Sequence, residues 1–255
     1  MGEELPSVLV IPGTEPQHVV PDGLRLQGVR GAFDELTAVG SVCIAWRREL
    51  TTEESTLSDL CDAYEDLVRE LELADLTIVG VSTGSLIAVE LAWRLGTRCS
   101  HLALVAGGAS VSDEGRVIIQ KTIEDARNGA WRDIARLQMR SFYPGIAGRF
   151  YGAVGRLFPA LYGTPEDPTH FIALSRVALA ADVFPRLPEL RAHVLCISGE
   201  NDIFFPPDEM HKLALLCPEG ESHVIPRAGH GVFKSHAAEI NKRIREFALR
   251  HSPAS

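Results

Sequence analysis

Three residue types that act together in acyl transfer, a serine, an aspartate and a histidine, each follow an apolar run of this sequence. Ser82 lies in the segment GVSTG, between an apolar run that ends at Val81 and a helical pattern that begins at Ser85. Glycines on both sides keep such a turn small, because strand and helix approach closely there. A serine hydroxyl is a poor nucleophile at neutral pH, so Ser82 needs a base and a group that orients the base.

Candidates for both partners follow later apolar runs. Asp202 lies in GENDIFFPP after the run 192–198, and His230 lies in RAGHGVF after the run 222–226. Ligands of an open α/β sheet bind beyond the carboxyl ends of its strands, so these positions are the first places to look for chemistry. The order serine, aspartate, histidine is the chain order expected when a G-x-S-x-G turn carries the nucleophile.

Other acids and histidines compete for these roles. We prefer His230 among the nine histidines because glycines flank it in a loop, whereas His236 falls in the last helical pattern and His223 begins a predicted strand. For the acid, the residues alone leave Asp202 beside the alternatives Glu200, Asp208 and Asp113.

A sheet must position these side chains, and the sequence predicts one. Short runs rich in Val, Ile and Leu alternate with segments of helical period, which is typical of a parallel sheet covered on both faces. The predicted strands are 7–11, 41–46, 76–81, 101–106, 192–198 and 222–226, and the predicted helices are 24–39, 57–73, 85–95, 207–216 and 235–250. We therefore expect an α/β fold with a mostly parallel six-stranded sheet flanked by helices.

One interval, residues 110–188, contains no predicted strand. Three or four helix-like segments in it are separated by NG, YPG, FPA, TPEDP and FPRLP. We interpret it as a helical insertion after the fourth strand, which leaves residues 1–109 and 189–255 as the core. Between Arg116 and Arg156 it holds eight Lys or Arg against three Asp or Glu. These arginines and the nearby aromatics are either an ordinary helical surface and core, or a lid that attracts an anionic or carrier-linked substrate.

The composition of the 255-residue chain excludes some functions. A net charge of -9 argues against nucleic acid, which needs a basic face. No signal peptide and no run long enough to span a bilayer is present, so we expect a cytoplasmic protein that acts on a small molecule and not on a membrane. The five cysteines are widely spaced without a CxxC pair, which indicates reduced thiols, and we predict neither a metal site nor a cofactor.

On these residues the chain resembles a lid-containing member of the α/β-hydrolase family. The resemblance runs from VLVIPGT to the last helix and puts residues 110–188 in the position of the family's lid. It implies that Ser82 is the nucleophile, that His230 is the general base and acid, and that Asp202 orients the imidazole. It also favours Asp202 over the other acids, because the family pattern places the aspartate upstream of a proline, here Pro206.

The resemblance further implies an oxyanion hole made of two backbone N–H groups. One belongs to Thr83, and the other to Thr14 in the segment PGTEPQH, where Gly13 permits close approach and Pro12 replaces the histidine of the family. The candidates for lining a substrate pocket are His18, Trp46, Trp131, Phe142, Tyr143 and Tyr151.

The loop after the second predicted strand departs from the family pattern. It begins with Arg47 and Arg48 and continues as ELTTEES, where many relatives have a glycine-rich turn. These arginines either support the structure or shape one side of the pocket.

Three functions follow as hypotheses. The first is a serine hydrolase that cleaves an ester, a thioester or a C–C bond next to a carbonyl through an acyl-enzyme on Ser82. The second is an acyltransferase or cyclising thioesterase, in which a bound alcohol or amine replaces water. The third is a lyase or ligand-binding protein on the same fold, without covalent chemistry at Ser82.

Overall fold

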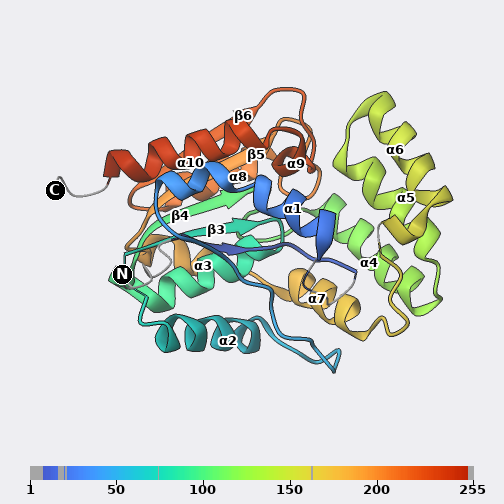
Figure 1. Ribbon diagram of the computed structural model, residues 1–255, viewed down its shortest axis with the longest axis horizontal. Helices are drawn as coiled ribbons and strands as arrows, with labels where there is room; N and C mark the ends of the chain where they lie inside the picture. Colours follow the sequence, from blue (N-terminus) through green and yellow to red (C-terminus); the bar gives the residue numbers. More distant parts are fainter. Residues whose placement is uncertain (1–7, 17–19, 21, 74, 162, 252–255) are drawn as a thin grey trace.

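The computed structural model describes residues 8–16, 20, 22–73, 75–161 and 163–251 (Figure 1). Six strands form one parallel sheet in the order β2-β1-β3-β4-β5-β6. Their bounds are β1 (Val8–Ile11), β2 (Val42–Ile44), β3 (Leu76–Val81), β4 (Cys99–Val105), β5 (His193–Gly199) and β6 (Gly220–Ile225). The predicted six-stranded parallel sheet is thereby confirmed.

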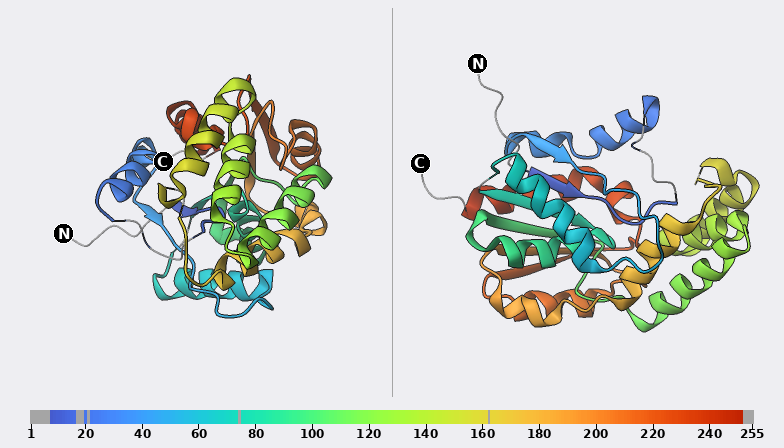
Figure 2. Two further views of the ribbon diagram at one scale, coloured as in Figure 1. Left: turned by 90° about the vertical axis from the view of Figure 1, so that its right-hand side faces the viewer. Right: turned by 90° about the horizontal axis from the view of Figure 1, so that it is seen from below.

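Helices cover both faces of this sheet (Figures 1 and 2). The helices α2 (Leu57–Glu70), α3 (Gly84–Leu95) and α8 (Pro207–Leu216) pack on one face, and the 3-10 helix η1 (Asp34–Ala38), α9 (Val232–Ser235) and α10 (Ala237–His251) pack on the other. Strand side chains alternate between the two faces, so that Leu9 and Ile11 join one apolar cluster while Val8 and Val10 join the other.

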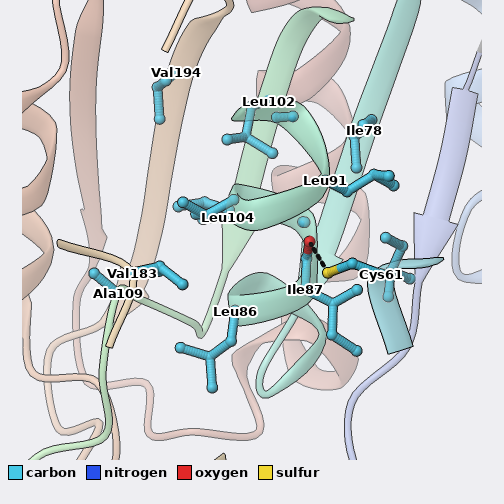
Figure 3. Packing of buried hydrophobic residues seen from close by; sticks show 14 of the residues in the cluster. Cys61, Ile78, Leu86, Ile87, Leu91, Leu102, Leu104, Ala109, Val183 and Val194 are labelled. Atoms are coloured by element: carbon cyan, nitrogen blue, oxygen red, sulfur yellow. Dashed lines mark hydrogen bonds between the residues drawn. The ribbon is translucent and has the colours of Figure 1, made fainter. Parts of the chain in front are cut away.

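The contact between α3 and the sheet forms the centre of the core (Figure 3). Leu86 and Leu91 of α3 lie against Ile78 of β3 and against Leu102 and Leu104 of β4. All five side chains are at most 1% exposed. The helix that follows Ser82 is therefore held firmly on the sheet.

The helix expected at 24–39 is shorter in the structure. The helix α1 (Gly23–Gly31) ends early, and the chain turns before η1 begins at Asp34. Gly28 and Gly31 weaken the second half of α1, because glycine loses more backbone entropy than other residues. The turn lets Leu36 of η1 become fully buried against the sheet.

Between β4 and β5 the described residues form four α-helices. They are α4 (Asp113–Arg127), α5 (Trp131–Phe142), α6 (Gly145–Leu157) and α7 (Thr169–Ala180). The 3-10 turns η3 (Pro159–Leu161) and η4 (Phe184–Glu189) also lie in this interval, and η2 (Gly96–Arg98) lies earlier, between α3 and β4. An apolar cluster of their own, centred on Ile134 and Phe171, joins α4, α5 and α7. Helices α5 and α6 form a hairpin at the end of the molecule toward which the strands run (Figures 1 and 2).

All five cysteines are free thiols that serve as small apolar side chains. Burial raises the pKa of Cys61, Cys99 and Cys217 to about 12, so these thiols stay protonated and unreactive at neutral pH. Across the described ranges, no helix is both long and apolar enough to cross a membrane.

A buried histidine makes the stability of the fold depend on pH. His101 is 5% exposed, stacks on His193 and meets the edge of Phe247. Burial, and then the charges of His193 and His251, lowers the pKa of His101 from 6.5 to about 4. Between these values the unfolded chain binds a proton that the folded protein does not bind. The stability that the neutral His101 contributes is therefore lost progressively as the pH falls from about 6.5 to about 4.

Replacing His101 is expected to remove this pH dependence. In the wild-type protein the residue should lower the free energy of unfolding by about 2 kcal/mol between pH 7 and pH 4.5. Urea unfolding at both pH values should therefore give a smaller difference for His101→Gln than for the wild type. His211→Gln, at an exposed histidine, is the control and should keep the wild-type difference. An unchanged difference in His101→Gln would contradict the assignment.

Candidate active site

The turn that carries Ser82 forces an unusual backbone conformation. Ser82 directly follows β3 with a φ of 53°, in the left-handed region that costs a non-glycine residue about 1–3 kcal/mol. Close packing explains the flanking glycines: a Cβ on Gly80 would lie 2.6 Å from the Cα of Ser85, and one on Gly84 would collide with the carbonyl oxygen of Ile11. The packed strand and helix hold the serine in this strained turn.

Ser82, His230 and Asp202 form one hydrogen-bonded chain, although they are far apart in sequence. The Oγ of Ser82 lies 2.9 Å from Nε2 of His230, and Nδ1 of His230 lies 2.9 Å from Oδ2 of Asp202. Both His230 and Asp202 are 3% exposed. When Nδ1 carries a proton and donates a hydrogen bond to Asp202, Nε2 is free to accept the proton of the serine.

Backbone donors fix the carboxylate of Asp202. Its Oδ1 accepts hydrogen bonds from the N–H groups of Phe204 at 2.9 Å and Phe205 at 3.1 Å. These bonds fix the orientation of the carboxylate toward the imidazole. The carboxylate can therefore stabilise a charged imidazole at this position.

The competing acids and histidines have other surroundings. The carboxylate of Glu200 accepts the N–H of Arg227 at 2.6 Å, and Asp113 and Asp208 lie in the first turns of α4 and α8. His223 lies 3.5 Å from Glu239, and His236 contacts the hydroxyl of Ser235. Of all the candidates, the structure brings Asp202 and His230 to Ser82.

Aromatic rings surround His230, and one comes from the helices between β4 and β5. The rings of Phe142, Phe204, Phe205 and Phe233 lie 4.7–6.5 Å from the imidazole between centroids. The carbonyl oxygen of Phe142, at the end of α5, also accepts the N–H of Gly231 at 2.9 Å. The end of α5 thus contacts the loop of the candidate base directly.

The loop after β1 lies against Ser82. A Cβ on Gly13 would be 3.0 Å from the Cβ of Ser82, so glycine permits this approach. The hydroxyls of Thr14 and Thr83 are 2.9 Å apart, which joins the two residues expected to supply the oxyanion hole. Within the described part of the chain, the backbone N–H groups of Thr14 and Thr83 donate no hydrogen bond.

Arg47 holds this loop from the other side. Its side chain is 9% exposed and donates to the carbonyl oxygen of Gly13 at 2.8 and 3.0 Å and to that of Pro12. In a trans peptide the C=O of one residue and the N–H of the next point in opposite directions. Because Arg47 binds the carbonyl of Gly13, the N–H of Thr14 points away from Arg47. From the sequence, only the position of Arg47 in the loop after the second predicted strand pointed to its contact with the loop after β1.

The predicted pocket residues have different surroundings. Phe142 lies beside His230. The rings of Tyr143 and Tyr151 lie 4.7 Å apart between centroids within the hairpin, and Trp131 meets Phe171 in the apolar cluster of α4, α5 and α7. Trp46 is partly buried next to Arg47, and His18 lies outside the described residues. A role in binding substrate stays a prediction for all six.

A parallel sheet with a hydrogen-bonded serine, histidine and aspartate after its strands is the arrangement of an α/β hydrolase. Residues 12–243 match the α/β hydrolase family, which is most of the chain. The chain belongs to this family.

Comparisons with individual proteins agree with this assignment. The chain is 39% identical over 85 residues to a 2-hydroxy-6-oxo-6-phenylhexa-2,4-dienoate hydrolase of Burkholderia cepacia, over 32% of this chain and 30% of the relative. The matched part thus spans about a third of the length of that relative. Two solved structures share the fold. MGS-M2, an α/β hydrolase enzyme from a deep-sea metagenome, has a TM-score of 0.81 and 17% identity, covering 100% of this chain and 93% of that one. The enol-lactonase from Burkholderia xenovorans LB400 has a TM-score of 0.76 and 18% identity, covering 96% and 92%.

Proposed function

We propose that this protein is a serine hydrolase that cleaves a bond next to a carbonyl group through an acyl-enzyme on Ser82. One observation carries the proposal: the hydrogen-bonded chain from the Oγ of Ser82 through His230 to Asp202, with distances of 2.9 Å at both links. Such a chain removes the serine proton as the oxygen attacks, which a lone serine cannot achieve at neutral pH.

The first half of the reaction forms the acyl-enzyme. The Oγ of Ser82 attacks the carbonyl carbon while Nε2 of His230 takes the hydroxyl proton, and the carbonyl oxygen becomes an oxyanion. The N–H groups of Thr14 and Thr83 stabilise this charge. When the tetrahedral intermediate collapses, the bond to the leaving group breaks and His230 donates its proton to that group. Asp202 stabilises the imidazolium throughout.

The second half releases the acyl group. A water molecule attacks the ester on Ser82 while His230 accepts one of its protons, and the same two N–H groups hold the second oxyanion. Collapse breaks the bond to Oγ, and His230 returns the proton to Ser82. The product is a free carboxylic acid. If an alcohol or amine replaced water, the same steps would give acyl transfer.

The names of similar proteins narrow the substrate. The relative from Burkholderia cepacia is named for a hydroxy-oxo-dienoate substrate. The structural neighbour from Burkholderia xenovorans is named for an enol lactone. Both are small organic molecules with a carbonyl group. We propose a substrate of this kind, with a C–C bond or an ester ahead of a thioester as the bond that is cleaved.

The helices between β4 and β5 fit the role of a lid over this site. In this proposal residues 110–188 form the lid and residues 1–109 and 189–255 form the core. Phe142 supports it, because its ring lies 5.2 Å from the imidazole of His230. Its carbonyl oxygen also binds the loop of that histidine. A movement of this helix end would therefore reach the catalytic base.

A substrate panel tests the proposed function. We expect turnover of a 2-hydroxy-6-oxo-dienoate or of an activated ester such as p-nitrophenyl acetate, with the acyl group released only as the free acid at every acceptor concentration. A burst of the first product, equal to the amount of enzyme, would accompany a slow second half. If an added alcohol or amine gave growing amounts of a new ester or amide, the proposed function would change from hydrolase to acyltransferase. Binding of the dienoate without turnover of any substrate in the panel would favour the third hypothesis.

A further inference from the structure

Helix α6 packs through its smallest residues. Gly148, Gly152 and Gly155 are buried, and a Cβ on Gly155 would lie 3.1 Å from the carbonyl oxygen of Ala135 in α5. One on Gly152 would lie 2.6 Å from Cγ of Arg140. The glycines therefore let α6 lie close against α5, and the side of α6 that faces the protein carries no large apolar residue.

The large apolar residues of α6 point the other way. Ile146 is 84% exposed, Phe150 64% and Leu157 69%. At about 100° per residue these three fall within about 40° of one another on the helix, and roughly opposite the three glycines. An ordinary surface helix buries its apolar stripe. In α6 the stripe faces solvent, beside the exposed Tyr151 and Phe158.

Arginines run along one side of this stripe. From Trp131 to Phe158 the hairpin carries five Arg and one Asp, a difference of +4, although the whole chain has a net charge of -9. Arg149 and Arg156 lie on the glycine side of the stripe by the same helical geometry. Arg140 of α5 lies where α5 and α6 meet, because Gly152 of α6 packs on the aliphatic part of its side chain. The single acid, Asp133, lies 3.8 Å from Arg156.

We propose that this outer face of the α5–α6 hairpin docks on an anionic lipid surface. Its residues are Ile146, Phe150, Leu157, Phe158, Arg140, Arg149 and Arg156. A helix that lies in a membrane interface buries one apolar face among the acyl chains and places cationic side chains beside it, at the level of the headgroups. Basic residues at such a surface gain binding free energy from anionic lipids.

The charge argues against a second copy of the chain as the occupant. A symmetric dimer through this face would set the same patch against itself, since equivalent surfaces meet across a twofold axis. Two patches with an excess of positive charge would then repel each other. The position of the hairpin at one end of the molecule leaves this face open for contact with a flat surface (Figures 1 and 2).

Vesicle co-sedimentation of the full-length protein tests the proposal. We expect binding to vesicles of phosphatidylcholine that contain phosphatidylglycerol, much weaker binding to pure phosphatidylcholine, and weaker binding as salt is added. The double variant Ile146→Ser/Phe150→Ser should bind the anionic vesicles at least roughly tenfold more weakly, because it removes the apolar residues that enter the bilayer. Arg149→Gln/Arg156→Gln should lose the preference for the anionic lipid.

Matched variants elsewhere on the surface control for general effects. Leu215 of α8 is 71% exposed and Leu249 of α10 is 59% exposed, so Leu215→Ser/Leu249→Ser removes similar apolar area far from the hairpin and should leave binding unchanged. Lys212→Gln/Lys242→Gln removes two exposed positive charges outside the hairpin and should keep the preference for the anionic lipid. The proposal would be overturned if the wild-type protein did not bind anionic vesicles, or if the α6 variants bound them as well as the wild type. A wild-type dimer that Ile146→Ser/Phe150→Ser converts to a monomer would also overturn it.

A hydrolysis assay without lipid separates this proposal from the catalytic one. The α6 variants should keep the wild-type kcat and KM on a small soluble substrate, because the changed residues are exposed and face away from the protein. A raised KM in Ile146→Ser/Phe150→Ser with unchanged vesicle binding would show that the stripe guides substrate, and would overturn lipid docking. Loss of turnover in Ser82→Ala with vesicle binding intact would leave the docking proposal standing on its own.

Discussion

Ser82→Ala is expected to lower kcat/KM by about 10⁴ to 10⁶-fold, which is the scale found when the nucleophile of a serine triad is removed. The Oγ that attacks the carbonyl is lost, and His230 then has no proton to accept from the enzyme. Activity that remains comes from the oxyanion donors and from binding. The substrate should still bind, so KM or a measured dissociation constant should change little. Steady-state kinetics on the best substrate of the panel give both values.

Labelling with a fluorophosphonate probe locates the nucleophile independently. The wild-type protein should be labelled on Ser82, and Ser82→Ala should not be labelled. Ser85→Ala is the matched control. Ser85 lies in the same turn, where its hydroxyl donates to the carbonyl oxygen of Ser82 at 2.6 Å and accepts the N–H of Gly108 at 2.8 Å. This variant should melt at a lower temperature but keep its label. Equal labelling of Ser82→Ala and the wild type would assign the nucleophile elsewhere.

Arg47→Met is expected to lower kcat by about 10- to 100-fold with a small change in KM. Loss of one oxyanion donor costs about 10² to 10³ in kcat, and a donor that is only misplaced costs less. Without the guanidinium, the carbonyl oxygens of Pro12 and Gly13 lose their partner and the loop is free to rotate. The N–H of Thr14 then stabilises the transition state less, although it hardly affects binding of the ground state.

Two further variants distinguish this positioning role from a purely structural one. Arg48→Met changes the exposed neighbour of Arg47 and should keep the wild-type kcat. Arg47→Lys keeps the charge but loses the forked pair of donors, so it should recover part of the rate. Melting curves measure how far each variant is destabilised. If Arg47→Met melts at a lower temperature while kcat stays at the wild-type value, the arginine supports the fold and not the oxyanion loop.

The sequence alone was enough to predict the sheet and its alternation with helices. Apolar runs mark strands because a strand buried on both faces must be apolar throughout, and this property is local. The same holds for the turn at Ser82, whose small neighbours reflect close packing of adjacent elements. The helix expected at 24–39 was wrong in its second half, because a weak helical pattern cannot show that the chain turns to bury Leu36.

Only the tertiary structure could decide the contacts across the chain. Ser82 and His230 are 148 residues apart, and Arg47 and Gly13 are 34 apart, so no local pattern reports their approach. The residues alone also left Glu200 beside Asp202, two residues away, and the turn after β5 decides which carboxylate faces the histidine. In α6 the fold buries the glycines and leaves the apolar stripe exposed. Periodicity tells which residues share a face of a helix, but only packing against α5 determines which face is turned inward.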